Sequence, residues 1–251
     1  MSKETFYLII YIWTGLAVVV FPMALFFTAP YGRHTKKTVG PMISNKLSWI
    51  IMEFPSLFLF SFFFLIGPVE KNAVHWVFFT LYVLHYVNRT FIWPLRTKTK
   101  GKKMPLLIMV SALLFNGFNG PINGYYLGYF SEYTVDWFFT PQFIIGALIF
   151  LIGATININS DNILLRLRKP GETGYKIPMG GMFRFVSAPN LFGEIVEWTG
   201  WAIMLWSFPS LSFAVWTFAN LVPRAIDHHK WYLERFEEYP KERKAVFPFL
   251  W

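Results

Sequence analysis

The sequence contains no cysteine, which excludes disulfides, thiolate nucleophiles, iron–sulfur clusters and cysteine-based zinc sites. Charge is also scarce: Asp, Glu, Lys and Arg make up 15% of the chain, against about 25% in an ordinary soluble domain. Of the 251 residues, 55% are apolar and 21% are aromatic. A soluble protein of this size could not keep so much apolar surface away from water, so the composition predicts a protein that uses lipid as its solvent.

Familiar nucleotide-binding and metal-binding motifs are missing as well. There is no GxGxxG or GxxxxGK[ST] motif, and Gly180-Gly181 is the only glycine pair, so neither a Rossmann nor a P-loop site is supported. There is no HExxH motif. The run Asp227-His228-His229 places adjacent residues on different sides of a helix. We therefore expect no metal.

Long apolar runs dominate the chain. A membrane-spanning helix needs about 20 mostly apolar residues, and candidates lie at about 6–28, 47–67, 74–95, 105–130, 137–158, 190–207 and 209–234. No small-residue cleavage pattern follows the first run, so we interpret it as a retained helix. Pro209 favours a tight turn between the last two. The prediction is an all-α integral membrane protein with seven transmembrane helices in a single domain, residues 1–251.

The net charge of +9 is unevenly distributed, because Lys and Arg gather in every second loop and in the tail. The basic segments are 29–46, 96–103, 159–189 and the tail 235–251. By the positive-inside rule these segments are cytoplasmic, and the N-terminus lies outside. Topology explains the charge without nucleic acid as a partner. We expect a multi-pass protein of the bacterial inner membrane, or of the endoplasmic reticulum in a eukaryote; no pattern sets the oligomeric state.

The loop 159–189 and the tail 235–251 are the long segments outside the predicted spans. The loop is rich in Gly, Pro and charge and contains a short helical candidate at 160–168. We interpret it as an ordered cofactor loop, with a flexible connector as the alternative.

A carboxylate and a phenol fall inside the second and third predicted helices. Glu53 lies about 10 Å, and Tyr86 about 15 Å, from the cytoplasmic end of its helix at 1.5 Å per residue. His85 and Arg89 are neighbours of Tyr86. Ionisable groups are costly in a bilayer and usually face a cavity or a partner. A purely structural Glu53 is the alternative, but a phenol at similar depth favours a site.

The fourth predicted helix carries a polar stripe on one face, formed by Asn116, Asn119 and Asn123. Glycines repeat this spacing on the adjacent face, at Gly117, Gly120 and Gly124. Close helix packing with amides as interhelical hydrogen-bonding groups explains the glycines well. Three amides on one face also suit the lining of a ligand cavity, and we place Asn119 among the substrate-binding candidates.

Polar residues also gather at the cytoplasmic side. Arg224, His228 and Tyr232 form one stripe near the end of the last predicted helix, suited to a phosphate and a flat ring, or simply to the helix C-terminus. Glu194 and Glu197 follow Asn190 near a helix start, where the helix dipole favours them. The large basic loop and its border add charge for a phosphate, a carboxylate for ribose hydroxyls and a ring for stacking: Asn157, Asp161, Arg168 and Tyr175.

Six stretches of the chain match one known family: Tyr31 to Thr35, Glu53 to Ser56, His85 to Thr90, Asn157 to Asp161, Leu167 to Gly171 and Asn190 to the C-terminus. In these stretches the chain resembles steroid 5-alpha-reductases, most closely the bacterial members. The stretches occur in order and cover nearly the whole chain. The resemblance implies seven transmembrane helices, NADPH as hydride donor, and irreversible reduction of the 4,5 double bond of a 3-oxo-steroid.

The resemblance also implies roles for individual residues. Glu53 and Tyr86 match positions that bind and polarise the 3-keto oxygen. The positions that match NADPH-binding residues are Asn157, Asp161, Arg168, Tyr175, Asn190, Glu194, Arg224, His228 and Tyr232, with Tyr31 and Lys102 added to the same site. The choice of NADPH over NADH rests on the resemblance.

Three positions depart from the mammalian pattern and leave the substrate open: Met52 stands in place of Gln, Ser111 in place of Arg, and Asp227 in place of one His. The alternatives are a reductase of another enone or of a polyprenyl or enoyl lipid, an isoprenylcysteine-type methyltransferase, and a transporter or receptor. Methyl transfer to a thiolate has no ketone for Glu53 and Tyr86 to polarise. A transporter usually concentrates polar groups near the midplane, not at the cytoplasmic side.

Overall fold

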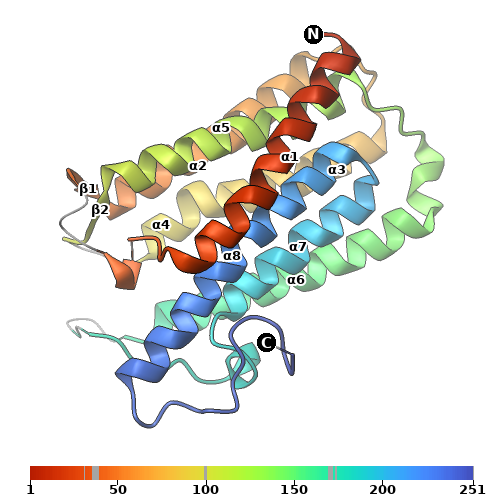
Figure 1. The fold of residues 1–251 in the computed structure, drawn as a ribbon. Coiled ribbons are helices and arrows are strands. Elements are labelled where there is room, and N and C mark those ends of the chain that lie inside the picture. The colour runs from red at the N-terminus through yellow and green to blue at the C-terminus, as the bar shows by residue number, and fades with distance from the viewer. Residues whose placement is uncertain (31, 36–39, 99–100, 169–171, 173, 251) are drawn as a thin grey trace. The chain divides into compact units, whose positions relative to one another are not determined.

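The computed structural model describes residues 1–30, 32–35, 40–98, 101–168, 172 and 174–250, and these are mostly helical (Figure 1). The α-helices are α1 (Lys3–Phe26), α2 (Asn45–Ile66), α3 (Ala73–Val87), α4 (Trp93–Arg96), α5 (Leu106–Tyr129), α6 (Pro141–Arg166), α7 (Pro189–Leu205) and α8 (Phe208–Arg235). Short 3-10 turns cover Gly32–His34, Val135–Phe139 and Gly181–Arg184, and a π-helical turn covers Asn88–Ile92. Strands β1 (Met42–Ser44) and β2 (Lys103–Pro105) pair antiparallel.

Each of the seven predicted apolar segments is largely helical, and the ends differ from the prediction by a few residues except in α6, which continues from 158 to Arg166. The third, 74–95, is α3, the π-turn and α4 in succession. Pro209 lies in the first turn of α8, directly after the Ser207 N-cap, as predicted. The helical candidate at 160–168 is helical as far as Arg166, but its placement in the loop was wrong, because these residues are the end of α6. No Gly or Pro occurs between Gly153 and Pro170, so nothing in the sequence interrupts the helix there.

Four helices among the described residues are long and apolar enough to cross a membrane: α1, α2, α5 and α6. This result confirms the prediction of an α-helical membrane protein. Helix α7 has 17 residues, slightly fewer than a typical span of about 20. The count of seven spans and the orientation of the termini stay predictions.

The chain divides into two compact units. Unit 1 comprises Met1–Ile10 and Ala29–Thr140, and unit 2 comprises Tyr11–Thr28 and Pro141–Trp251. Helix α1 therefore contributes residues to both units. The single-domain organisation stays a prediction, and the units are described separately below.

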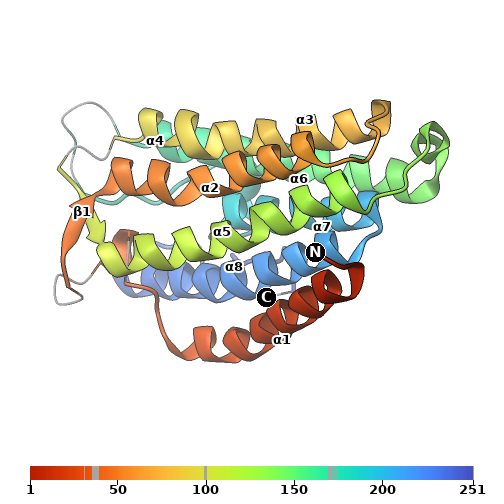
Figure 2. The same cartoon turned by 90° about the horizontal axis from the view of Figure 1, so that it is seen from above.

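In unit 1, α2 lies between α3 and α5 (Figure 2). Helices α2 and α5 run in the same direction, because Gly120 contacts the backbone of Ser56 and Gly124, one turn later, contacts that of Phe60. A Cβ atom at Gly124 would lie 2.4 Å from the Phe60 carbonyl oxygen. Gly120 and Gly124 therefore allow α2 and α5 to pack closely, as small residues do between membrane helices. Gly117 has no such contact and faces open space.

This difference between the glycines gives a matched test of stability. We expect Gly124→Ala to destabilise the protein by about 1–3 kcal/mol, because the new methyl group collides with the backbone of α2. Gly117→Ala meets no atom within 4 Å and should be neutral, or stabilising by up to about 1 kcal/mol through helix propensity. Thermal unfolding in detergent compares the two. A lower Tm for Gly117→Ala than for Gly124→Ala would contradict the packing described here.

Helices α2 and α3 pack antiparallel through aromatic rings. The rings of Phe60 and Tyr82 stack with centroids 3.7 Å apart, and those of Phe64 and Phe79 lie 4.7 Å apart. As α2 advances, the partners on α3 therefore move back toward its start. This register fixes which residues of the two helices lie level with each other.

In unit 2, α7 lies between α6 and α8 (Figure 1). Glycines of α6 and α7 contact the facing backbone in antiparallel register: Gly193 faces Asn157, and Gly153 faces Glu197. The start of α7 is therefore held beside the last third of α6. On α8, the indole of Trp216 donates to the carbonyl of Trp13 in the unit 2 part of α1, at 3.0 Å.

Candidate functional site

Glu53 is a buried carboxylate of unit 1, 9% exposed, held by the facing helix α5. The Asn116 amide nitrogen donates to Glu53 Oε2 at 3.2 Å and to the carbonyl of Met52 at 2.6 Å. The hydroxyl of Ser56 donates to Asn116 Oδ1 at 2.9 Å. Since the oxygen of the amide is occupied by Ser56, its nitrogen is directed toward Glu53. Asn116 is thus an interhelical hydrogen-bonding residue that orients the carboxylate.

Arg89 is the second partner of Glu53. Its Nε lies 3.7 Å from Glu53 Oε1, and its guanidinium lies over the Trp49 ring, 4.6 Å from the ring centroid. Arg89 belongs to the π-turn Asn88–Ile92, and π-turns inside helices are frequent at functional sites. The sequence showed Arg89 only as a neighbour of Tyr86 and contained no indication of Trp49.

Tyr86 is 4% exposed, and its ring stacks on that of Tyr82, 4.7 Å away. Two contacts show which part of α2 lies opposite Tyr86. Phe60 contacts Tyr82, and Glu53 contacts Arg89. Tyr86 lies between Tyr82 and Arg89 in sequence, so it is about one helical turn from Glu53 along α2. This agrees with the similar depth expected for the two residues.

The remaining asparagines of the stripe are buried as well. Asn119 and Asn123 are each 1% exposed, and the Asn123 amide donates to the carbonyl of Asn119 at 3.1 Å. The asparagine stripe is therefore buried inside unit 1. Both interpretations of it, interhelical hydrogen bonding and the lining of a ligand cavity, require this. The substrate-binding role of Asn119 stays a prediction.

In unit 2, three predicted cofactor-binding residues meet where α6 faces the start of α7. The Asn157 amide donates to the backbone carbonyl of Asn190 at 2.9 Å, and the Asn190 amide donates to Asp161 Oδ1 at 3.1 Å. Asn157 is 6% and Asp161 is 5% exposed. Two amides and a carboxylate are therefore gathered and oriented, an arrangement suited to the hydroxyls and amide of a nucleotide cofactor.

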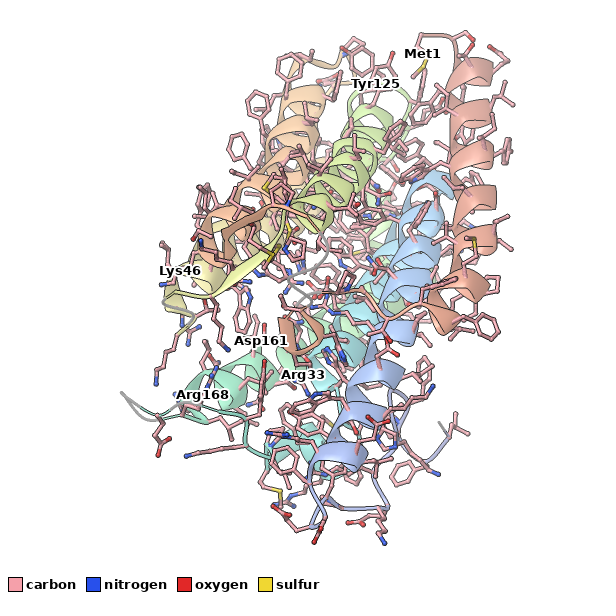
Figure 3. All side chains as sticks on the ribbon, turned by 60° about the vertical axis from the view of Figure 1, so that its left-hand side comes forward. Met1, Arg33, Lys46, Tyr125, Asp161 and Arg168 are labelled. Carbon is pink, nitrogen blue, oxygen red and sulfur yellow. The ribbon has the colours of Figure 1, made fainter. Side chains whose placement is uncertain are left out.

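Further along the chain, two more of these residues lie in or beside the basic loop. Arg168 follows Asp161 at the end of α6 (Figure 3), and its Nη1 donates to the carbonyl of Gly174 at 3.5 Å. The ring of Tyr175 meets that of Trp231 on α8 edge-on at 4.9 Å. The loop is therefore attached to α8 where the structure describes it.

Glu194 and the stripe Arg224, His228 and Tyr232 lie on α7 and α8. Leu191 and Ile195 of α7 share a core with Leu221 and Ala225 of α8, which brings Glu194 and Arg224 to the same level of this helix pair. Tyr232 is 2% exposed and stacks on Tyr239 of the tail, with ring centroids 5.0 Å apart and planes 8° from parallel. The tail therefore covers one face of the Tyr232 ring.

A hydrogen-bonded group that sequence reasoning missed joins the loop, α8 and the tail. The hydroxyl of Ser187 lies 2.6 Å from His229 Nδ1 and 2.6 Å from the hydroxyl of Tyr239. Burial raises the pKa of the Tyr239 phenol above its usual value, so it keeps its proton at neutral pH. Ser187 thus connects two segments that are distant in sequence.

Arg243 fastens the tail to the same loop. This arginine is 3% exposed; its Nη1 donates to the carbonyl of Pro178 at 3.0 Å and its Nη2 to the sulfur of Met179 at 2.8 Å. Its guanidinium also lies 5.1 Å from the Tyr239 ring centroid. The only sequence indication of this contact was the run from Glu237 to Phe249 within the family resemblance.

We expect Ser187→Ala to loosen the tail, because it leaves His229 and Tyr239 without the hydroxyl they share. A buried polar group that loses its partner costs about 1–3 kcal/mol. Hydrogen exchange of the amides in 236–246 should therefore increase about tenfold or more. Ser207→Ala, at the α7–α8 turn of the same unit, is the control and should leave tail exchange unchanged. Equal exchange in wild type and Ser187→Ala would show that Ser187 does not hold the tail.

Two further residues complete the set predicted for the cofactor. Tyr31 lies outside the described residues. Lys102 is an exposed residue of unit 1 just before β2, and its carbonyl accepts from the backbone nitrogen of Asn45 at 3.0 Å. Within the described part of the chain, no group of three or more His, Asp or Glu side chains could hold a metal ion.

Comparison with known proteins gives consistent matches. The family model of 3-oxo-5-alpha-steroid 4-dehydrogenase matches residues 102–251. Steroid 5-alpha-reductase DET2 of Solanum lycopersicum is 45% identical over 254 residues, covering 100% of this chain and 98% of the relative. The 3-oxo-5-alpha-steroid 4-dehydrogenases 1 of Macaca fascicularis and Homo sapiens are each 43% identical over 222 residues, covering 88% of this chain and 84% and 85% of theirs.

The apolar helices with their buried polar clusters, together with these relatives, define the class as a membrane oxidoreductase. The chain belongs to the steroid 5-alpha-reductase family. The expected closeness to bacterial members stays a prediction.

Proposed function

We propose that this protein uses NADPH to reduce the 4,5 double bond of 3-oxo-4-ene steroids, with Glu53 and Tyr86 polarising the 3-keto oxygen. The observation that carries the proposal is the buried Glu53, oriented by Asn116 and Arg89 about one turn from Tyr86. The names of the relatives supply the reaction class.

The chemistry asks for hydrogen-bond donors at the ketone. When a hydride adds to carbon 5 of the enone, the electron pair of the double bond moves toward the 3-keto oxygen, and a proton later adds at carbon 4. A donor aimed at that oxygen stabilises the transition state. Tyr86 donates its phenol proton. Glu53, held by Asn116 and the Arg89 guanidinium, orients Tyr86, and it donates to the same oxygen when it carries a proton. Asn119 contributes to the substrate-binding surface.

The donor set in unit 2 fits NADPH. The oriented amides and carboxylate of Asn157, Asn190 and Asp161 suit ribose and nicotinamide groups, and arginines suit phosphates. The complete proposed set is Asn157, Asp161, Arg168, Tyr175, Asn190, Glu194, Arg224, His228 and Tyr232, with Tyr31 and Lys102. NADPH supplies the hydride when bound. Preference over NADH rests on the family resemblance.

We place this site in a single domain, 1–251, with seven spans, an outside N-terminus and a cytoplasmic C-terminus. The basic segments 159–189 and 235–251 then lie on the side where NADPH is available. The membrane is the bacterial inner membrane, or the endoplasmic reticulum in a eukaryote.

The test is NADPH oxidation by the detergent-purified protein, followed by absorbance, with progesterone or testosterone added and the product compared with 5-alpha and 5-beta standards. Steroid-dependent oxidation with a 5-alpha product is expected, and NADH in place of NADPH tests the cofactor preference. NADPH binding without steroid turnover would overturn the steroid assignment in favour of a lipid enone. Absence of NADPH binding would overturn the cofactor assignment.

A further inference from the structure

An apolar groove lies within unit 2, and none of the residues assigned above line it. Its volume is about 600 Å³, within the usual range of about 300–1,000 Å³ for small-molecule sites. Only residues of α7, α8 and the turn between them line it: Thr199, Ala202, Ile203, Trp206, Ser207, Phe208, Leu211, Ala214, Val215 and Phe218.

The lining offers little to bind a polar group. It contains no ionisable residue, and its two hydroxyls already have partners. Thr199 donates to the carbonyl of Ile195 at 2.8 Å, and the hydroxyl of Ser207 lies 2.9 Å from that of Ser210. Trp206, which is 66% exposed, adds an indole N–H. The groove therefore suits an occupant that is apolar along its length and has its polar atoms only beside Trp206.

The position of the groove gives it access to lipid. Gly146, near the start of α6, contacts the backbone of Met204, which places the α7–α8 turn level with one end of a helix able to span a membrane. Two lining residues of α8 are strongly exposed, Leu211 at 48% and Phe218 at 38%. The groove is therefore open beside these two apolar side chains.

Trp206 marks the mouth of the groove. It is 66% exposed and adopts a left-handed backbone conformation, with φ 47° and ψ 45°, at a helix end where glycine is usual. A tryptophan at this position is sterically less favourable than glycine, yet its ring lines the groove at the end of the span. Tryptophan is enriched where membrane meets water.

From these observations we propose that the groove binds one acyl chain of a membrane phospholipid, in the leaflet at the α7–α8 turn. The chain lies against Ala202, Ala214 and Val215, and Trp206 contacts its upper part near the headgroup. The headgroup makes no specific contact with the lining, so the site selects for the chain and not for the charge of the lipid. The lining shares no residue with the proposed steroid site, and the proposal does not depend on the reductase assignment.

Native mass spectrometry of the purified full-length protein with dioleoylphosphatidylcholine tests the proposal. Ala214→Phe fills the groove and should weaken lipid binding at this site at least tenfold. Ala147→Phe, the same change at a partly buried alanine of α6 outside the groove, is the control and should bind as wild type does. Dioleoylphosphatidylglycerol should bind equally well, because no charge lines the groove. A Tm close to that of the wild type shows that Ala214→Phe is folded.

Fluorescence provides an independent readout. Phosphatidylcholine with brominated chains quenches the fluorescence of nearby tryptophans. Part of this quenching should come from Trp206, so Trp206→Phe should remove it. Ala214→Phe, which keeps the lipid out of the groove, should remove the same part. Undiminished lipid binding and quenching in Ala214→Phe would overturn the proposal. Displacement of the lipid by testosterone would also overturn it, because the groove would then be a steroid site.

Discussion

Tyr86→Phe should lower kcat for steroid reduction by about 10²–10³, the usual effect of removing one donor to a developing oxyanion, and Glu53→Gln should lower it by a similar factor, because the neutral amide loses both the carboxyl group and its ion pair with Arg89. Both changes keep the shape of the side chain. The amide introduced by Glu53→Gln still places a polar group within reach of Asn116, and Tyr86→Phe keeps an aromatic ring stacked on Tyr82. The loss should therefore fall on kcat, with KM and thermal stability little changed.

Tyr126→Phe is the matched control for Tyr86→Phe. Tyr126 is a phenol of the same unit whose hydroxyl accepts from Tyr133 at 3.4 Å. The control should keep a rate within about threefold of wild type, since it removes one neutral hydrogen bond away from Glu53. Steroid turnover is measured from NADPH absorbance, with the Tm of each variant recorded alongside. Near wild-type turnover in both Glu53→Gln and Tyr86→Phe would refute the ketone-polarising roles.

The helices of this chain could be predicted from the sequence because their lengths follow from the apolar runs. Pro209 and its neighbours likewise predict the turn before α8. The pairing of β1 with β2 could not be predicted, since each strand has three residues and shows no alternating pattern. The continuation of α6 to Arg166 needed only the absence of Gly and Pro, but its polar composition suggested a loop.

The types of residue in the site were also predictable, but their contacts were not. A buried Glu53 among apolar residues is conspicuous in the sequence. Its bond to Asn116 depends on how closely Gly120 allows α5 to approach α2, and its contact with Arg89 depends on a π-turn. These are properties of packing, and no sequence spacing specifies them.

The contacts of the tail 235–251 could be predicted from the sequence even less than those of Glu53. Ser187, His229 and Tyr239 belong to three segments, and each alone is an ordinary polar residue. Their meeting follows from α8 bringing His229 beside the loop and from Arg243 fastening the tail. The resemblance drew attention to the tail as a conspicuous run, without saying which of its residues face inward.

Asn190→Ala should weaken NADPH binding by about tenfold to a hundredfold. The change removes the donor that orients Asp161, and hydrogen bonds to charged groups contribute about 1.5–3 kcal/mol. The fold should survive, because Asn157 donates to the backbone carbonyl of residue 190, which alanine keeps. The Kd is measured by NADPH fluorescence or calorimetry on detergent-purified protein.

Asn220→Ala is the control for Asn190→Ala, since Asn220 is an exposed asparagine of α8 in the same unit. It should leave the Kd for NADPH unchanged. Kinetics then separate the two halves of the proposal: Asn190→Ala should raise KM for NADPH, whereas Glu53→Gln should lower kcat at saturating NADPH. An unchanged Kd in Asn190→Ala would mean that Asn157, Asp161 and Asn190 only join α6 to α7. Weaker binding with kcat preserved at saturation would assign this cluster to the cofactor and leave the chemistry to Glu53 and Tyr86.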